Sequence, residues 1–201
     1  MTIELDPSCF RPLNVTDACG VWNILSSKIL YNTATSVPAK CVFSCTGFVH
    51  YECLIKPRNN KTDEEMELRR RLTCEIKKGQ FKSYHLEIED LQEIEILEQR
   101  KKLGKGELSS IAFAKRTRQA FLTDDDKARK LAEKVMERKS VQTTPHLLGW
   151  LFYRNLLSDS EKEAIINEHN KFRIKKWGNL EKHFEVMYER SLKYRLMSRT
   201  I

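Results

Sequence analysis

Carboxylates follow two of the buried segments that the sequence predicts to be strands. Asp17 ends the first segment, residues 11–17, and the pair Asp124 and Asp125 comes directly after another, residues 119–123. In parallel sheets, sites form beyond the carboxyl ends of the strands. We therefore expect these side chains, which are distant in the chain, to face one site.

Two further acids belong to helices expected near the same edge. Glu107 falls in the first turn of a helix that opens after a glycine break, and Glu52 falls on the helix after a second short strand, residues 41–43. Four separate segments could thus direct carboxylates at one place. The alternative is that each acid caps a helix, because any acid after a strand can do so and the chain has 28 acids.

Carboxylates that converge repel one another unless a cation offsets their charge. Mg²⁺ and Mn²⁺ prefer carboxylate and water oxygens, and one or two such ions can activate a water for attack on a phosphodiester. A basic surface beside the acids would hold the rest of a polyanion. This combination predicts a nuclease whose cofactor is Mg²⁺ or Mn²⁺.

The net charge of the chain suits such a substrate. It is +8, and the excess falls entirely in residues 104–201. A basic surface attracts polyanions, although a solvated helical face is the simpler explanation of charge alone. The densest stretch contains four basic residues: Lys171, Arg173, Lys175 and Lys176.

Short apolar strands alternate with helices along most of the chain, and these elements must position the acids. Strands are expected at residues 11–17, 41–43, 81–86, 119–123 and 141–143. Helices are expected at residues 18–30, 46–54, 63–78, 89–102 and 127–138, and also from residue 106 and from residue 144. Such alternation predicts an α/β fold with a parallel sheet between helix layers.

The last part of the chain is expected to be helical. We expect one domain over residues 1–157 and a C-terminal helical extension, residues 158–201, packed on or beside it. The extension contains an amphipathic pattern with steps of three and four residues: Trp177, Leu180, Phe184 and Met187. Its apolar face is expected to pack against the domain; the alternative is a surface for a protein partner.

The composition excludes several other classes. There is no run of about 18 apolar residues, which excludes a membrane span, and the first residues lack a signal-peptide pattern. We therefore expect a cytoplasmic protein whose six cysteines stay reduced. A zinc site at Cys41, Cys45, His50 and Cys53 is the weaker alternative to buried thiols, because structural zinc sites usually separate two ligand pairs by a longer spacer.

Three motifs, in this order, resemble those of the PIN domain family. They are Val15-Thr16-Asp17-Ala18-Cys19, then Leu103-Gly104-Lys105-Gly106-Glu107, then Leu122-Thr123-Asp124-Asp125-Asp126-Lys127-Ala128-Arg129. The similarity runs from about residue 12 to residue 157. It is greatest to the branch with a Gly-x-Gly-Glu helix start and an Asp-Asp-x-Lys-Ala-Arg turn.

The resemblance implies a Rossmann-like parallel sheet flanked by helices and a Mg²⁺- or Mn²⁺-dependent nuclease site that most often acts on RNA. By position, Asp17, Glu107 and Asp125 match family acids, and Asp124 is a helper or cap beside the last. The second family acid fits Glu52 best, as a metal ligand or as a group that orients a water. The expected metal ligands are therefore Asp17, Glu107, Asp124 and Asp125.

The chain departs from the family pattern at Cys19, Trp22 and Asn23, which could reshape the floor of the pocket. Two functions stay open. The first is a metal-dependent endonuclease, on RNA sooner than DNA, acting as a toxin or a defence-system effector. The second is a catalytically silent adaptor of the same fold that binds nucleic acid or protein. Expected partners are nucleic acid and an inhibitory or scaffold protein at the C-terminal helices; a homo-oligomer is left open, and a membrane is not expected.

Overall fold

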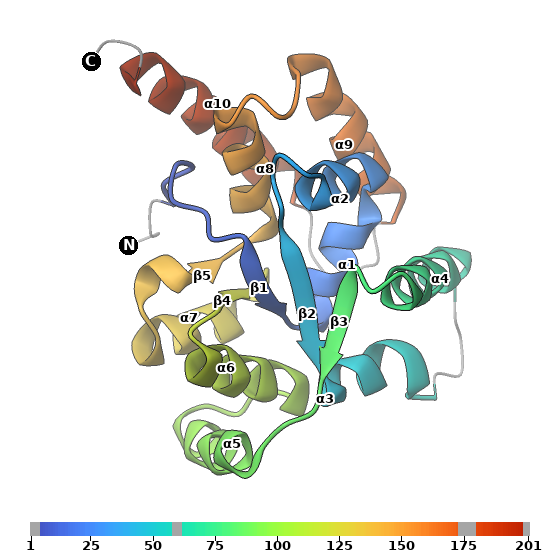
Figure 1. The fold of residues 1–201 in the computed structure, drawn as a ribbon, viewed down its shortest axis with the longest axis vertical. Coiled ribbons are helices and arrows are strands. Elements are labelled where there is room, and N and C mark those ends of the chain that lie inside the picture. The colour runs from blue at the N-terminus through green and yellow to red at the C-terminus, as the bar shows by residue number, and fades with distance from the viewer. Residues whose placement is uncertain (1–4, 58–61, 173–179, 199–201) are drawn as a thin grey trace.

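One parallel sheet forms the centre of the molecule. A computed structural model describes residues 5–57, 62–172 and 180–198. Within them five parallel strands pair in the order β3-β2-β1-β4-β5 (Figure 1). The strands are β1 (Leu13–Thr16), β2 (Val42–Thr46), β3 (Phe81–Tyr84), β4 (Ala120–Leu122) and β5 (Val141–Gln142). The predicted α/β class with a Rossmann-like sheet is confirmed.

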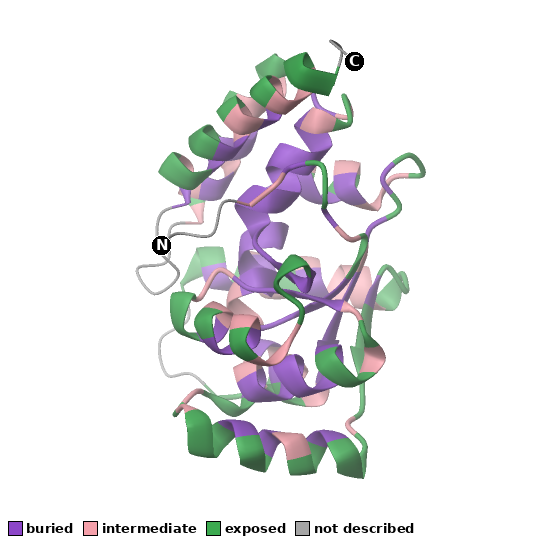
Figure 2. Ribbon diagram, turned by 90° about the vertical axis from the view of Figure 1, so that its left-hand side faces the viewer, coloured by how far each residue is buried: buried purple, intermediate pink, exposed green. Residues whose placement is uncertain are grey.

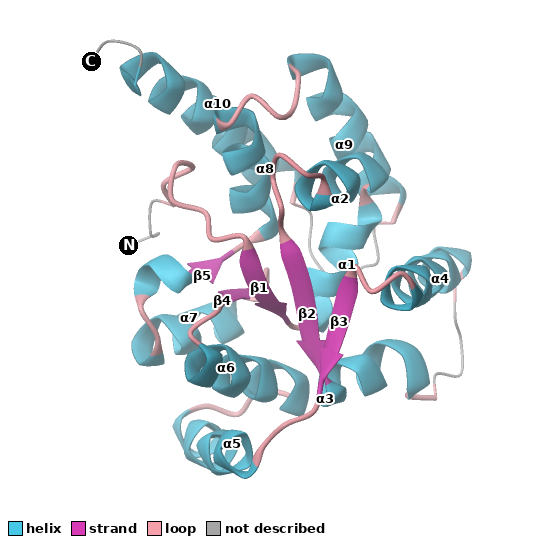
Figure 3. Cartoon of the chain, in the orientation of Figure 1, coloured by secondary structure: helices cyan, strands magenta, loops and turns pink. Residues whose placement is uncertain are grey.

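Helices cover both faces of the sheet (Figure 3). One layer consists of α1 (Ala18–Ser26), α2 (Lys28–Thr35), α4 (Asp63–Lys77) and α8 (Thr144–Tyr153), and the other of α5 (Ile88–Arg100), α6 (Lys105–Thr117) and α7 (Asp126–Val135). Each layer has its own apolar core. Trp22 and Phe152 belong to the first core, and Ile111 and Phe121 belong to the second. Figure 2 shows the buried interior between exposed helix faces.

Two predicted helices differ from the observed ones. The segment predicted as one helix, residues 18–30, is divided at Ser27, whose hydroxyl accepts a hydrogen bond from the backbone N–H of Leu30 (3.1 Å) and so caps α2. A serine at this place favours a new helix start. The helix predicted after β2 is a short α3 (Gly47–His50) that continues as a π-helix (Tyr51–Ile55). A 3₁₀ turn (Arg138–Ser140) precedes β5.

The C-terminal helices α9 (Asp159–Lys171) and α10 (Glu181–Ser198) pack on the first layer. Ile165, Ile166 and Phe184 are buried in the same apolar core as Trp22. This packing accounts for the amphipathic pattern of α10, although Trp177 and three of the basic residues, Arg173, Lys175 and Lys176, lie outside the described residues. The division at residue 157 stays a prediction. No described helix combines the length and the apolarity needed to cross a bilayer.

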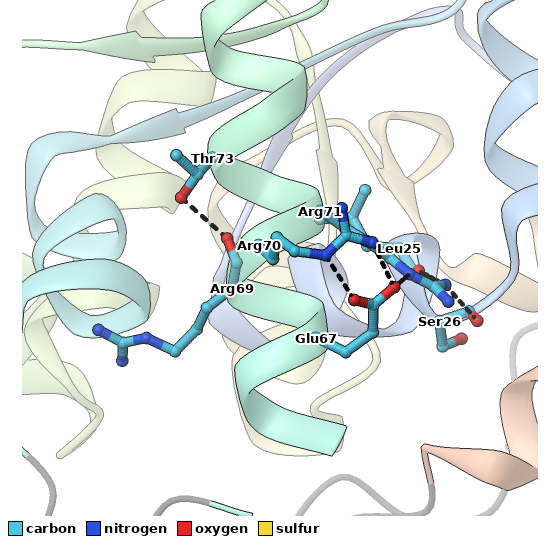
Figure 4. A network of polar contacts seen from close by, with 7 residues as sticks. All are labelled: Leu25, Ser26, Glu67, Arg69, Arg70, Arg71 and Thr73. Atoms are coloured by element: carbon cyan, nitrogen blue, oxygen red, sulfur yellow. Dashed lines mark hydrogen bonds and ion pairs between the residues drawn. The ribbon is translucent and has the colours of Figure 1, made fainter. Parts of the chain in front are cut away.

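Arg71 ties α4 to the end of α1 (Figure 4). Its Nη1 donates to the backbone carbonyls of Leu25 (2.8 Å) and Ser26 (3.0 Å). These belong to the last turn of α1, where carbonyls lack intrahelical partners. Its Nε donates to Glu67 (2.9 Å), and the ring of Phe172 lies 4.5 Å from the guanidinium. The Arg71 side chain is only 14% exposed, so these contacts are largely shielded from water.

We expect Arg71→Met to lower the free energy of unfolding by about 2 kcal/mol, because hydrogen bonds to charged groups contribute about 1.5–3 kcal/mol. Methionine keeps most of the apolar stem and removes the guanidinium. Urea denaturation measures the loss. Arg70→Met is the control: Arg70 also pairs with Glu67, but its side chain is 67% exposed, so a smaller loss is expected. Equal losses would contradict the role of Arg71.

Candidate active site

Asp17 lies at the end of β1 with a carboxylate that is shut off from solvent (1% exposed). Its Oδ1 accepts a hydrogen bond from the backbone N–H of Gly20 (2.8 Å), which makes Asp17 the N-cap of α1. Its Oδ2 accepts a hydrogen bond from the hydroxyl of Thr123, directly after β4. Both oxygens are therefore held, and the ends of two neighbouring strands are joined.

Thr123 also connects Asp17 to Asp125. The hydroxyl of Thr123 accepts a hydrogen bond from the backbone N–H of Asp125 (3.0 Å). Asp125 in turn caps α7, because its Oδ1 accepts from the backbone N–H groups of Lys127 (2.8 Å) and Ala128 (2.7 Å). The structure thus brings these two predicted acids to one place. It also shows that both are helix caps, as the alternative explanation required.

Asp124 is held by α1 and α8. Its Oδ2 accepts from the side-chain amide of Asn23 (2.8 Å) and from the hydroxyl of Thr144 (2.6 Å), and its Oδ1 accepts from the backbone N–H of Thr144 (2.9 Å). Asn23 is one of the positions at which the chain departs from the family pattern. Its amide positions a carboxylate, so this departure contributes directly to the site.

The first turn of α6 makes room for the two other acids. A Cβ at position 106 would collide with a carboxylate oxygen of Glu52, and a Cβ at position 104 would collide with one of Glu107. The two glycines of the Gly-x-Gly-Glu motif therefore leave space for one carboxylate each. Glu107 folds back to the start of α6, where the helix dipole favours an acid. Glu52 approaches the same turn from the π-helix.

Electrostatic coupling identifies which acids share a site with Asp17. Burial raises the pKa of the Asp17 carboxyl to about 7, while the hydrogen bonds from Thr123 and Gly20 act in the opposite direction. Repulsion from Asp124 and from Glu107 adds to the rise in pKa. The charges of Asp17 after β1, Asp124 after β4 and Glu107 in α6 therefore act on one another. Glu52 is instead placed by its contact with the first turn of α6.

Cys19 is the one thiol among these acids in the described part of the chain. Burial, followed by repulsion from Asp17, Asp124 and Asp125, raises the pKa of the Cys19 thiol. The thiolate is the nucleophilic form of cysteine, and it is scarce when the pKa is high. The surroundings of Cys19 therefore disfavour a nucleophilic role and leave the carboxylates as the reactive groups of the site.

The donors fit a hard divalent cation in their chemistry. All are carboxylates, and a cation beside Asp17 would stabilise its charge, which burial and then repulsion from Asp124 and Glu107 disfavour. Their arrangement is not a finished cage: in the described residues, no group of three or more His, Cys, Asp or Glu side chains is placed to hold a metal ion. Side chains would have to rotate to complete the coordination.

A cavity of about 300 Å³ opens beside Asp124. Arg129 of α7 and His183 and Arg190 of α10 line it, together with Asp126, which pairs with Arg129. The C-terminal extension therefore contributes a guanidinium and an imidazole to the cavity beside Asp124. The charge excess of this half of the chain was apparent from the sequence, but His183 and Arg190 were not predicted. Helical spacing alone does not tell which exposed face turns toward a site.

Thr123 and Thr144, the two hydroxyls that hold the acids, were not predicted from the sequence either. Thr123 stands directly between a strand and an acidic run, and Thr144 begins a helix. A threonine adjacent to such acids was the available signal, since its hydroxyl can donate to a carboxylate.

Asp17 is expected to destabilise the fold at neutral pH. Its pKa is about 7 in the folded chain against an ordinary 3.8, so between these values the folded chain keeps a proton that the unfolded chain releases. The free energy of unfolding therefore falls as the pH rises from about 4 to about 7, and the loss is complete above pH 7. We expect Asp17→Asn to raise this free energy at pH 8 by up to about 4 kcal/mol, at about 1.36 kcal/mol per pKa unit.

Urea denaturation of both proteins across this pH range measures the effect. Asp126→Asn is the control. Pairing with Lys130 and Arg129 lowers the pKa of Asp126, so this exposed carboxyl is ionised in both the folded and the unfolded chain between pH 4 and pH 7 and adds no pH dependence there. An unchanged pH dependence in Asp17→Asn would contradict the assignment.

Comparisons with known proteins do not assign the chain to a family. No protein-family model, no curated protein and no solved structure matches it. The similarity to the PIN domain family therefore rests on the three motifs, and membership of that family is a proposal. What the structure contributes is the geometry: carboxylates at the carboxyl edge of a parallel sheet, beside a cavity lined by cations.

Proposed function

We propose that the chain is a Mg²⁺- or Mn²⁺-dependent endonuclease of the PIN type that hydrolyses phosphodiester bonds, in RNA sooner than in DNA. One observation carries the proposal: the buried carboxylate of Asp17, at the end of β1, is repelled by Asp124 and Glu107 from two other elements. Burial, and repulsion to a smaller degree, disfavour the charge of Asp17, so either a proton or a bound cation must offset it, and a divalent cation could serve several of these carboxylates at once.

The roles of the acids follow from their positions. Asp17, Glu107 and Asp125 would ligate the ion, Asp124 would ligate it or support it, and Glu52 would ligate it or orient a water. The bound ion would supply the attacking water and offset charge on the scissile phosphate. Thr123 is a positioning residue, because its hydroxyl bonds Asp17 and the backbone N–H of Asp125. Asn23 and Thr144 position Asp124 in the same manner.

The cavity beside Asp124 supports a polyanionic substrate. Arg129, His183 and Arg190 could neutralise phosphates on either side of the scissile bond. The charge of +8 for the whole chain would draw such a substrate to the surface. These features favour nucleic acid over a small phosphate ester, because two arginines line the cavity beside Asp124 and could contact more than one phosphate.

A second function is favoured by a separate observation. Both oxygens of Asp17 and both oxygens of Asp124 already accept hydrogen bonds from protein groups. Such a network is also what a catalytically silent adaptor would keep to stabilise its fold. In that case the basic cavity would bind nucleic acid or a protein partner without cleavage.

The biological setting belongs to the proposal as well. A cytoplasmic nuclease of this kind would need restraint, either as a toxin bound by an antitoxin or as a defence-system effector held by a larger assembly. The exposed faces of α9 and α10 are the surfaces that we propose for an inhibitory or scaffold partner. Self-association is a further arrangement that measurement of the oligomeric state would test.

Cleavage of labelled single-stranded RNA tests the enzyme directly. We expect cleavage with Mn²⁺ or Mg²⁺, none with a chelator, and a loss of at least about 100-fold in Asp17→Asn, because metal ligation and charge stabilisation each supply several kcal/mol. Mn²⁺ should also raise the melting temperature of the unsubstituted chain and not that of Asp17→Asn.

Asp63→Asn is the matched control, since Asp63 is an exposed acid of α4 that does not line the cavity and should leave cleavage within about threefold. Tight RNA binding without cleavage under all of these conditions would contradict the nuclease proposal and support the adaptor. Full activity of Asp17→Asn would contradict the assignment of the active site to Asp17.

Binding of RNA in the presence of a chelator tests the cavity. We expect Arg190→Gln to weaken binding and to reduce the slope of log affinity against log salt by about one, because one phosphate contact is lost. Lys193→Gln is the control: it removes the same charge from α10 at an exposed position that does not line the cavity. Equal effects of both substitutions would show a diffuse charge effect and contradict a phosphate site in the cavity.

A further inference from the structure

A second and larger groove opens beside Glu52. Its volume is about 600 Å³, and its walls are largely apolar. Phe48 and Tyr51, three residues apart on α3 and the π-helix, line one side, and Leu86 and Leu91 line the other. Both aromatic side chains are exposed in part: Phe48 is 38% exposed and Tyr51 is 46% exposed. We call this feature the α3 groove.

The rim of the α3 groove is basic. Lys56, Lys105 and His85 line it, and Glu52 is its one acid. Lys105 also pairs with Glu98 (2.7 Å) and is half exposed, so its ammonium remains near the rim. Exposed aromatic rings between cations are a feature of surfaces that bind single-stranded nucleic acid.

Glu52 and Lys105 connect the α3 groove to the first turn of α6. Tyr51 and Glu52 are consecutive residues of the same π-helix, and the carboxylate of Glu52 contacts the first turn of α6. Glu107, whose charge repels that of Asp17, belongs to the same turn. A π-helix is rare and frequently marks a functional site. A group bound against the Tyr51 ring would therefore share the groove with the carboxylate of Glu52.

We propose that the α3 groove receives an unpaired base of a single-stranded nucleic acid, which stacks on Tyr51 and Phe48 while Lys56 and Lys105 contact the flanking phosphates. The inference rests on the proposed function and deepens it, because it names the strandedness of the substrate. A duplex keeps its bases inside the helix and cannot present one to the groove. Lys56, Lys105 and His85 outnumber the one acid of the lining, which favours a polyanion over an apolar protein segment.

Binding in the presence of a chelator tests the proposal without cleavage. The probes are a short labelled single-stranded RNA, the matching single-stranded DNA and the RNA duplex, followed by fluorescence anisotropy. We expect Tyr51→Ala to weaken single-strand binding by about tenfold or more, since stacking on one aromatic side chain contributes on the order of tenfold to a hundredfold in affinity. Tyr51→Phe keeps the ring and should bind within about threefold of the unsubstituted chain.

Ile55→Ala is the matched control, because Ile55 belongs to the same π-helix and is 58% exposed but does not line the groove. Circular dichroism verifies that each variant is folded, which is expected because both side chains are largely exposed. The same dependence on Tyr51 with DNA also supports the proposal, since stacking does not read the sugar.

Three results would overturn the proposal: normal single-strand binding by Tyr51→Ala, duplex binding as tight as single-strand binding, or no binding of either strand. Normal single-strand binding by Tyr51→Ala, found in a chain that cleaves RNA, would contradict base binding in the α3 groove and leave the nuclease proposal intact. Conversely, Tyr51-dependent binding by a chain that never cleaves RNA would support base binding in the groove and contradict the nuclease proposal.

Discussion

The buried carboxylate of Asp17 is the constraint on which the site depends. It caps α1 through Gly20, accepts a hydrogen bond from Thr123 at the end of β4, and is repelled by Asp124 and Glu107. Hydrogen bonds hold its position, while burial and repulsion disfavour its charge. A fold with no use for charge here could replace the acid by asparagine, which also caps helices. The carboxylate in this place is therefore the reason to look for a cation.

The same few groups serve the fold and the site together. Asp17 and Asp125 begin helices, and the backbone N–H groups that they satisfy would otherwise lack partners. Because Gly104 and Gly106 have no side chain, the carboxylates of Glu107 and Glu52 can lie against the start of α6. Because each acid has a structural role, helix capping and ligand binding are compatible explanations, and a change at one acid affects both stability and chemistry.

The C-terminal helices belong physically to the site as well as to the core. Phe184 of α10 is buried with the first helix layer, while His183 and Arg190 of the same helix line the cavity beside Asp124. The α3 groove contains aromatic rings beside Glu52. Two of the acids therefore line hollows of different chemistry: Asp124 lines a cavity with two arginines, and Glu52 lines an aromatic groove.

Much of this organisation was predictable from local patterns. Alternating strands and helices predicted the parallel sheet, and the carboxyl-edge rule predicted where Asp17, Asp124 and Asp125 would meet. Local capping chemistry was also readable, since an acid or a serine before a helix start satisfies neighbouring N–H groups. The helix boundary at Ser27 could have been found by this rule, whereas the π-turn after α3 has no comparable signal.

The sequence by itself determined the fold class, the acidic positions at strand ends and the basic balance of the second half, because these follow from local periodicity and composition. Only the tertiary structure decided which groups touch. Thr123 bonds Asp17 across 106 positions, and Asn23 bonds Asp124 across 101. Such contacts depend on strand order and helix packing, which are properties of the whole chain. For the same reason, only the folded structure shows that Arg190 of α10 lines the cavity beside Asp124 and that Phe48 and Tyr51 line the α3 groove beside Glu52.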